Sequence, residues 1–517
     1  MKRMLHMAAL ALCMGLLLSS AWAEGAQVPD ASALFSDRDL RQDYDAGGAV
    51  TITLTGDGAA CDSGAVVIDG SRITIAAEGV YVLSGTLADG QVVVQAGEAD
   101  KVLLVLGGAE ITSADSAAIC CMEADKVFLT LAEGTENALA NGGAFSDADG
   151  TGIDAAVYAK TDLTLNGAGS LTVTSPAGHG IVSKDELTVT GGSYAVEAAG
   201  HGLTGKDGVA IAAGSFVITA GKDGIHAEHG TNARKGNLYI ADGSFAVTSQ
   251  GDALNVTGWL QIDGGSFALT AGGGSDSVEM SSGDMMPWGG GFRGFGAAGS
   301  APQTAQETEN TQSCKGIKAD GPIAVNGGTF TLDTADDAVH CGADVTLTGG
   351  IWSIRTGDDA VHADGAVTVT GGTYGISRCY EGVEGVAVVI TGGTLDITAN
   401  DDGINAAGGT DGSGRGFGFG MQDEFAPIDG CDVTVSGGSI TIVSDGDCID
   451  SNGSLTVSGG TLDLTCNGNG NTAIDSNGAF THTGGEITTN DGSENGGMGG
   501  RGGMGGKGGS RKGMPRP

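Results

Sequence analysis

Pairs of adjacent acidic residues recur at a fixed spacing in the second half of this chain. Asp336-Asp337 is followed 22 residues later by Asp358-Asp359, and Glu381 and Asp401-Asp402 continue the same phase. If each repeat stacks directly on the previous one as a parallel strand, equivalent carboxylates lie about 5 Å apart. Two like charges at that distance repel by about 1 kcal/mol in water and about 3 kcal/mol at an effective dielectric near 20. A bound cation would remove this repulsion.

Calcium is the cation that such an arrangement suits. It takes roughly six to eight oxygen ligands in tolerant geometry, and stacked carboxylates together with glycine carbonyls supply such oxygens. The alternative is that each aspartate only caps its own turn by accepting backbone N–H groups. Two acids in one turn exceed what capping needs, which favours calcium. The candidate metal ligands are Asp336, Asp337, Asp358, Asp359, Glu381, Glu384, Asp401, Asp402, Asp447 and Asp450.

Two further features of each repeat define the elements that position these acids. A Gly-Gly pair recurs in the same phase, as in Gly349-Gly350 and Gly371-Gly372, and residues such as Ala366–Thr370 alternate between apolar and hydroxyl side chains. This alternation is typical of a half-buried strand. A repeat of about 20–25 residues with short strands indicates a solenoid in which each unit contacts only its neighbours. We therefore predict an all-β parallel β-helix with about 22 residues and three short strands in each coil.

The phase also predicts which side chains point inward. The expected core ladder is Ile181, Leu203, Ile225, Leu254, Ile317, Val339, Val361, Val383, Ile404, Ile449 and Ile474. The next residue in each coil should face outward and form a polar ridge on which an extended polymer could lie. The ridge residues are Lys318, His340, His362, Glu384, Asn405, Asp450 and Asp475. We expect its two stacked histidines to be solvated, because no third ligand for a transition metal appears at a suitable spacing.

Composition and charge restrict the class of protein further. The chain has 97 glycines and 8 prolines without a triplet period, which excludes collagen, and its aromatic content of 5% suits a slim core. The net charge is −39, and it becomes −46 for residues 24–494 because seven basic residues and no acids lie outside that range. Such a body repels nucleic acid and anionic lipid, so neither is an expected partner.

The order of segments suggests an exported protein. Residues 1–23 combine Lys2-Arg3, an apolar run and Ala21-Trp22-Ala23, which are the three parts of a secretory signal peptide, and no segment predicts a membrane span. Residues 24–155 are expected to form an N-terminal β region or cap. Residues 156–490 should form the β-helix, interrupted by insertions at 272–313 and 407–430. Residues 491–517 form a predicted disordered basic tail that could contact an anionic cell wall.

Nine cysteines remain once Cys13 of the signal peptide is excluded. An odd number in an exported protein means that at least one thiol is free or pairs with another chain, and most of the nine are expected to be small core residues. The first insertion contains Trp288 and Phe292, which either belong to a flexible loop or offer flat apolar faces to a sugar ring.

Several motifs together resemble a family of secreted bacterial carbohydrate-binding proteins. They are the corners Asp401–Ile404 and Tyr380–Glu384, the Gly-Gly-Thr turns, the segment Gly79–Leu87 and the Gly-Met-Arg tail, within residues 50–517. The family is similar to pectate lyases in fold, so the resemblance implies a right-handed parallel β-helix with bound calcium and binding of cellulose or polygalacturonate. His179 and His201 occupy corners where this pattern has acids, which places calcium in those coils in doubt.

These observations predict a secreted, calcium-dependent and non-catalytic binder of plant cell-wall polysaccharide. The expected carbohydrate contacts are Lys318, His340, His362, Trp288 and Phe292. Two alternatives stay open: a calcium-assisted polysaccharide lyase and a structural protein of the cell surface or matrix. A lyase needs a basic side chain beside the metal to remove the proton α to the uronate carboxylate. The basic residues in or near the acidic coils are Lys315, Lys318, Arg355 and Arg378.

Overall fold

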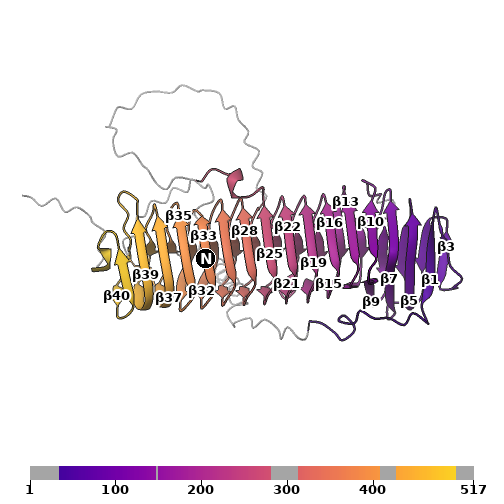
Figure 1. The fold of residues 1–517 in the computed structure, drawn as a ribbon, viewed down its shortest axis with the longest axis horizontal. Helices are drawn as coiled ribbons and strands as arrows, with labels where there is room; N and C mark the ends of the chain where they lie inside the picture. Colours follow the sequence, from indigo (N-terminus) through magenta and orange to yellow (C-terminus); the bar gives the residue numbers. More distant parts are fainter. Residues whose placement is uncertain (1–33, 147–149, 281–312, 408–426, 496–517) are drawn as a thin grey trace, which may run out of the picture.

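The computed structural model describes residues 34–146, 150–280, 313–407 and 427–495. These residues form an elongated stack of short parallel strands that run across the long axis of the molecule, from the indigo end near β3 to the yellow end near β40 (Figure 1). The chain is therefore all-β, and the predicted parallel β-helix is confirmed. Among the described residues no helix is long and apolar enough to cross a membrane.

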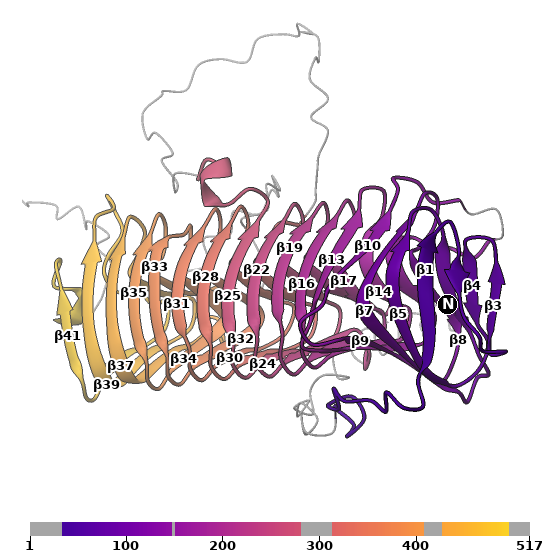
Figure 2. The same cartoon turned by 45° about the vertical axis from the view of Figure 1, so that its right-hand side comes forward.

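Three parallel sheets make up the walls of the solenoid, and each coil contributes one strand segment to each sheet (Figure 2). Sheet I follows the acidic corners and consists of β4 (Arg72–Ile75), β6 (Gln91–Gln95), β8 (Ile119–Glu123), β11 (Ala155–Ala159), β14 (His179–Ser183), β17 (Leu203–Gly205), β20 (Ile225–Ala227), β23 (Leu254–Val256), β26 (Ile317–Ala319), β29 (Val339–Cys341), β36 (Ile404–Ala406), β38 (Ile449–Ser451) and the first parts of β32 (Val361–Val369) and β34 (Val383–Ile390).

Sheet II comes next along each coil. It consists of β9 (Lys126–Leu131), β12 (Asp162–Gly167), β15 (Glu186–Val189), β18 (Gly208–Ile211), β21 (Asn237–Ile240), β24 (Leu260–Ile262), β27 (Ile323–Val325), β30 (Val345–Leu347), the later parts of β32 and β34, the first parts of β37 (Val433–Ser444) and β39 (Leu455–Cys466), and β40 (Phe480–His482).

Sheet III follows the Gly-Gly turns. It consists of β1 (Val50–Gly56), β5 (Gly79–Leu87), β7 (Lys101–Ser113), β10 (Glu136–Asn141), β13 (Ser170–Ser175), β16 (Ser193–Ala198), β19 (Ser215–Ala220), β22 (Ser244–Ser249), β25 (Ser266–Ala271), β28 (Thr329–Thr334), β31 (Ile351–Thr356), β33 (Thr373–Arg378), β35 (Thr394–Ala399), the later parts of β37 and β39, and β41 (Glu486–Thr489). The first part of β7 also pairs with β9 of sheet II.

The N-terminal end departs from this regularity. Here β2 (Ala59–Ala60) pairs antiparallel with β1, and β3 (Val66–Asp69) pairs antiparallel with β4. The segment before β1, which looks only weakly patterned in sequence, is anchored by a buried residue: Asp39 accepts hydrogen bonds from Thr164 at 2.6 Å and pairs with Lys126 at 2.8 Å. The segment that contains Asp39 is thus attached to the outer face of β9 and β12.

The predicted core ladder is confirmed. Register pairs Val339 with Val361, Val361 with Val383 and Val383 with Ile404, and the same alignment runs from Ile181 to Ile474. Every ladder residue is at most 2% exposed. In a parallel stack the repeat length sets this register, because a shift by one residue would turn the apolar side chains toward solvent.

A second ladder, made of aromatic rings, fills the space inside sheet III. Its members stack ring on ring with centroids 3.8–5.8 Å apart, and they are Tyr194, Phe216, Phe245, Phe267, Phe330, Trp352 and Tyr374. All are at most 3% exposed. The expectation of a core too slim for many rings is therefore wrong, because flat rings that stack at the strand spacing occupy little width in each coil.

Removal of one ring from this aromatic ladder should lower the free energy of unfolding strongly. Phe267→Ala removes a ring that stacks on Phe245 and Phe330, and we expect the free energy of unfolding to fall by about 3–5 kcal/mol. Val217→Ala, on the outward side of β19 and 57% exposed, should change it by less than about 0.5 kcal/mol. Urea unfolding followed by circular dichroism measures both, and equal effects would contradict the packing described above.

The described part of the first insertion packs on the solenoid. It contains a short 3-10 helix, η2 (Ser275–Ser277), and Asp276 in it pairs with Arg355 at 2.8 Å and Arg378 at 2.6 Å. A second short helix, η3 (Ser493–Asn495), follows β41. The nine cysteines form no disulfide in the described residues; six are buried and three are partly buried, which agrees with their expected role in packing.

Candidate functional site

Two files of polar side chains run side by side along the corner that precedes sheet I. The corner file contains the residue two positions before each ladder residue: His179, His201, Asp223, Asp252, Lys315, Asp337, Asp359, Glu381, Asp402, Asp447 and Thr472. The ridge contains the residue just after each ladder residue, and register extends it from the predicted Lys318–Asp475 back to Asn255 and His226. The candidate site lies along these two files.

One oxygen of each corner aspartate is used to cap the following coil. The Oδ1 atom of Asp337 accepts the backbone N–H of Asp359 at 3.1 Å, and Asp359 accepts that of Glu381 at 3.0 Å. Asp402 accepts the N–H of Asp447 at 2.6 Å. The capping interpretation therefore holds in a different form, since each aspartate caps the turn of its neighbour instead of its own. The second carboxylate oxygen is left to face the ridge.

A buried lysine already neutralises the first acidic corner. The Nζ atom of Lys315 lies 2.8 Å from Asp336 Oδ1 and 2.6 Å from Asp337 Oδ2, and His340 Nδ1 lies 2.8 Å from the same Asp337 oxygen. Burial alone would raise the pKa of Asp337, but Lys315 and His340 outweigh it and hold that pKa below its usual range. An ammonium thus occupies the position where we expected calcium between these acids, although Asp358 also has an oxygen within 4.8 Å.

Without Lys315, the carboxylates of Asp336 and Asp337 should repel each other and destabilise the fold. Lys315→Met leaves the buried Asp337 without its main counter-charge, so we expect a loss of stability of about 3 kcal/mol or more in EDTA. Calcium should restore part of that loss, because the space between Asp336 and Asp337 can then take an ion. Lys206→Met, at an exposed position, should have little effect. Thermal melts with and without calcium measure this, and an unchanged melt for Lys315→Met would show that the ion pair is not needed.

The second acidic corner contains a buried imidazole. His362 is 1% exposed, and its Nδ1 atom lies 2.7 Å from Glu384 Oε2 and 3.2 Å from Asp359 Oδ2. Burial lowers the pKa of His362, but the two carboxylates outweigh it and raise it to about 11. The expectation that both stacked histidines are solvated is therefore wrong for His362. His340, by contrast, is partly exposed.

The last acidic corners have no basic counter-charge within the part of the chain that the structure describes. Asp447, Asp450 and Asp475 each place an oxygen within 4.8 Å of the others, and Asp401 and Asp402 lie one coil below. Burial, followed by repulsion from neighbouring carboxylates, raises the pKa of Asp450 to about 6. Burial and the same repulsion raise that of Asp447 to about 7 and that of Asp402 well above its usual value. We call these five residues the carboxylate cluster.

The donor set of the carboxylate cluster fits calcium. All of its side-chain donors are carboxylate oxygens, and the three that approach one another are partly exposed, so an ion and its water ligands can enter. Asp402 keeps one oxygen after capping Asp447, whereas Glu381 Oε2 accepts a hydrogen bond from Asn405 Nδ2 at 2.9 Å. Sequence spacing identified most of this group, but placed Asp475 on the ridge without counting it as a ligand.

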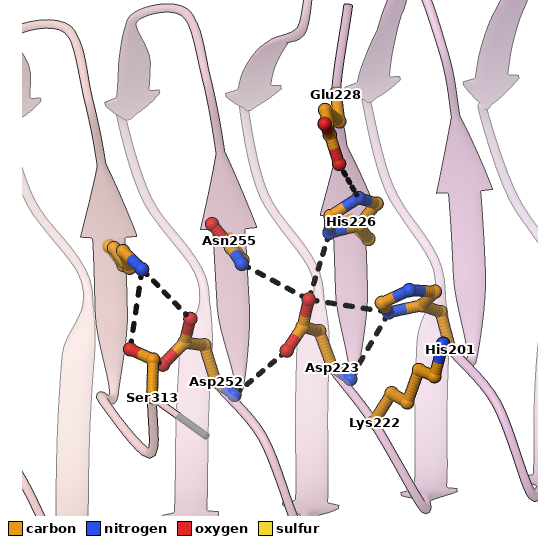
Figure 3. Close-up of a pocket in the computed structure, with 9 residues that line it drawn as sticks. His201, Lys222, Asp223, His226, Glu228, Asp252, Asn255 and Ser313 are labelled. Atoms are coloured by element: carbon orange, nitrogen blue, oxygen red, sulfur yellow. Dashed lines mark hydrogen bonds and ion pairs between the residues drawn. The ribbon is translucent and has the colours of Figure 1, made fainter. Parts of the chain in front are cut away.

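An open pocket of about 350 Å³ lies at the other end of the ridge (Figure 3). Lys222, His226, Asn255, Asp252 and Lys318 are among the residues that line it. The Nζ atom of Lys318 lies 3.7 Å from Asp252 Oδ2 and 3.3 Å from Ser313 Oγ. This pocket suits a hydroxylated ligand, because charged groups of both signs line it and its volume can hold a sugar unit. Trp288 and Phe292 lie outside the described residues.

Comparison with known proteins now adds an independent observation. The sequence matches the model of a family described as carbohydrate-binding domain-containing proteins over residues 69–360 and 358–499, a span that includes both polar files. The chain belongs to this family. Binding of carbohydrate is therefore the general role that the family indicates for this chain.

Two individual proteins are similar to parts of the chain. A carbohydrate-binding domain-containing protein of Acetivibrio thermocellus is 36% identical over 129 residues, which is 25% of this chain and 45% of the relative, so the match spans less than half of that protein. A solved structure, described as the polysaccharide lyase-like protein from C. thermocellum in a gadolinium derivative, has 32% sequence identity and a TM-score of 0.41. It covers 42% of this chain and 89% of the other.

Proposed function

We propose that this protein is exported and binds plant cell-wall polysaccharide without cleaving it, with calcium held by the carboxylate cluster. The observation that carries the proposal is the set of neighbouring carboxylates without a described basic partner, in a chain of the carbohydrate-binding family. Export is inferred from the signal-like residues 1–23. Cellulose and polygalacturonate are the polymers that we propose.

Calcium would serve as the link to an anionic polymer. The body carries a large negative charge, so a uronate chain would be repelled unless a cation lies between the two. Asp447, Asp450 and Asp475 would hold the ion together with water and backbone oxygens, and its remaining positions would accept uronate carboxylates. A neutral glucan needs no such link and would instead use polar contacts along the ridge.

The basic residues argue against a lyase. Lys315 is buried between two aspartates whose charges outweigh the effect of burial and raise its pKa, so it stays protonated and cannot act as a base. Arg355 and Arg378 pair with Asp276. Lys318 is accessible, but it lies five coils from Asp450 along the ridge, or about 24 Å at the strand spacing. A general base must reach the proton at about 3 Å, so Lys318 cannot act beside calcium in the carboxylate cluster.

Binding to immobilised polygalacturonate and to cellulose, each measured with calcium and with EDTA, tests this proposal. Release of unsaturated uronides from polygalacturonate, followed by ultraviolet absorbance, tests for catalysis in the same samples. Uronide release that is lost in Lys318→Ala would overturn the non-catalytic proposal in favour of a lyase.

A further inference from the structure

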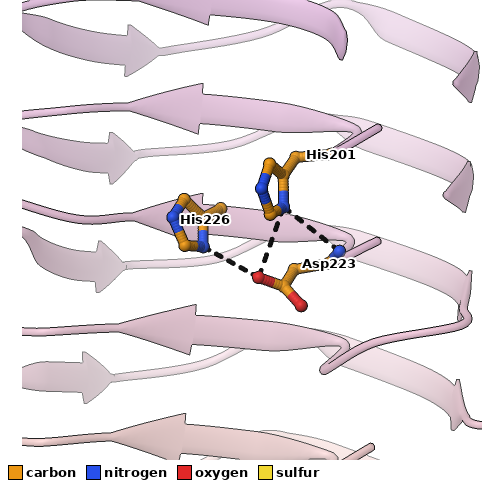
Figure 4. A group of neighbouring side chains, drawn as sticks. All are labelled: His201, Asp223 and His226. Carbon is orange, nitrogen blue, oxygen red and sulfur yellow. Dashed lines mark hydrogen bonds and ion pairs between the residues drawn. The ribbon is translucent and has the colours of Figure 1, made fainter. Parts of the chain in front are cut away.

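Two imidazoles and one carboxylate converge at the floor of the ridge pocket, in coils that precede the predicted calcium region (Figure 4). His201 and Asp223 belong to the corner file before β17 and β20, and His226 lies within β20. The Oδ2 atom of Asp223 is 3.3 Å from His201 Nδ1 and 2.8 Å from His226 Nδ1. The two rings stack with centroids 4.1 Å apart. The side chains are only 10–15% exposed.

Hydrogen bonding leaves one of the three ligand atoms, His226 Nδ1, unsatisfied, whereas Asp223 Oδ2 accepts a hydrogen bond from Asn255 Nδ2 at 3.1 Å. His201 Nδ1 accepts the backbone N–H of Asp223 at 3.2 Å, so this nitrogen carries a lone pair and its contact with Asp223 Oδ2 brings two acceptors together. His226 Nδ1 is buried and makes no aligned hydrogen bond to any described residue, although it lies 2.8 Å from the same oxygen. Three potential ligand atoms thus surround one point. A cation there would turn the repulsion between acceptors into attraction.

The distances suit a tetrahedral ion. Zinc binds nitrogen and oxygen at about 2.0–2.1 Å, which places the ligand atoms of a tetrahedron about 3.3 Å apart. The observed separations of 2.8 Å and 3.3 Å are close to that value. Binding would cost the hydrogen bond between Asp223 N–H and His201. Three protein ligands leave a fourth position, which the surrounding pocket opens to solvent.

A second carboxylate supports one of the ligands. The Oε2 atom of Glu228 lies 3.3 Å from His226 Nε2, on the side of the ring opposite Asp223 (Figure 3). Glu228 would accept the Nε2–H and thereby leave the Nδ1 lone pair free for an ion. A carboxylate that orients a metal-bound histidine in this way is a recurrent feature of zinc sites.

We propose that His201, Asp223 and His226 bind a divalent transition-metal ion of the zinc type at the floor of the ridge pocket, with Glu228 orienting His226. Two nitrogen donors distinguish this site from a calcium site, because calcium takes oxygen ligands. The site is also separate from the carboxylate cluster: His226 lies seven coils from Asp450 along the ridge, or about 34 Å. It therefore goes beyond the proposed function and does not depend on it.

Calorimetric titration of the full chain with Zn²⁺ in excess Ca²⁺ tests this site. We expect zinc binding in the wild type, loss of that binding event in His226→Gln and Asp223→Asn, and affinity roughly 10- to 100-fold weaker in Glu228→Gln. Asn at position 223 can still accept the backbone N–H of Asp252, which Asp223 Oδ1 accepts at 2.9 Å, so the fold is preserved. His229→Gln is the matched control, because His229 pairs with Asp207 outside the group.

Two results would overturn the proposal. One is zinc binding that is absent in the wild type or equally strong in the wild type, His226→Gln and Asp223→Asn. The other is a spectrum with Co²⁺ that shows a thiolate charge-transfer band, since the ligands would then be cysteines. Circular dichroism and melting in EDTA confirm that each variant is folded. None of these readouts involves polysaccharide, so they are independent of the polymer-binding experiments.

Discussion

We expect chelation with EDTA to lower the affinity for polygalacturonate by at least roughly 100-fold and to leave the affinity for cellulose within about twofold of its value with calcium. The physical reason is the charge of the body and of the polymer, which have the same sign. Replacing one attractive ion-mediated contact by repulsion between carboxylates at about 5 Å costs about 3 kcal/mol at an effective dielectric near 20. That energy corresponds to roughly 100-fold in affinity. Depletion assays with insoluble cellulose and titration with oligogalacturonate measure the two polymers separately.

Two sets of variants distinguish the effect of the carboxylate cluster on polygalacturonate binding from the effect of the overall charge. Asp447→Asn together with Asp450→Asn should copy chelation, because both oxygens face the proposed ion. Asp463→Asn removes one negative charge from an exposed position on β39 and should leave binding unchanged. Polygalacturonate binding that persists undiminished in EDTA would mean that the carboxylate cluster does not link polymer and protein through calcium.

In EDTA, the melting temperature should fall as pH rises from about 4 to about 7. The pKa of Asp447 is about 7 and that of Asp450 about 6 in the folded chain, because burial and neighbouring carboxylates disfavour the charged form. In the unfolded chain an aspartate titrates near 3.9. The folded state therefore binds more protons in this pH window, and the free energy of unfolding decreases as pH rises through it. Because solvent partly screens these side chains, we expect the free energy of unfolding to decrease by about 2–4 kcal/mol between pH 4 and pH 7.

Calcium should flatten this pH dependence, since a bound ion favours the charged carboxylates and stabilises the native state by mass action. The double variant Asp447→Asn/Asp450→Asn should melt higher than the wild type in EDTA at pH 7, and its melting temperature should depend less on pH than that of the wild type. Asp463→Asn should keep the wild-type profile. A melting temperature that rises between pH 4 and 7 in EDTA, for the wild type, would show that these acids are already neutralised by other groups.

The tertiary arrangement explains why the first acidic corners differ from the last. Asp337 and Asp447 occupy equivalent positions in the corner file, and sequence spacing predicts the same role for both. One coil earlier, however, Lys315 replaces the acid and pairs with Asp337, whereas no described base pairs with Asp447. The electrostatic character of a corner is therefore set by the coil below it as much as by its own residues.

The sequence by itself determined the fold, the register and the stacking of the acids. In a parallel solenoid the repeat length sets which residues lie above one another, and the repeated corner motif carries the phase of Val339 and Val361 across the insertions. Only the tertiary structure decided which partner each polar side chain meets. His362 is buried between Asp359 and Glu384, and His201, Asp223 and His226 meet around one point. Each of these groups joins two neighbouring coils, and its contacts depend on side-chain direction and burial, which a one-dimensional repeat does not specify.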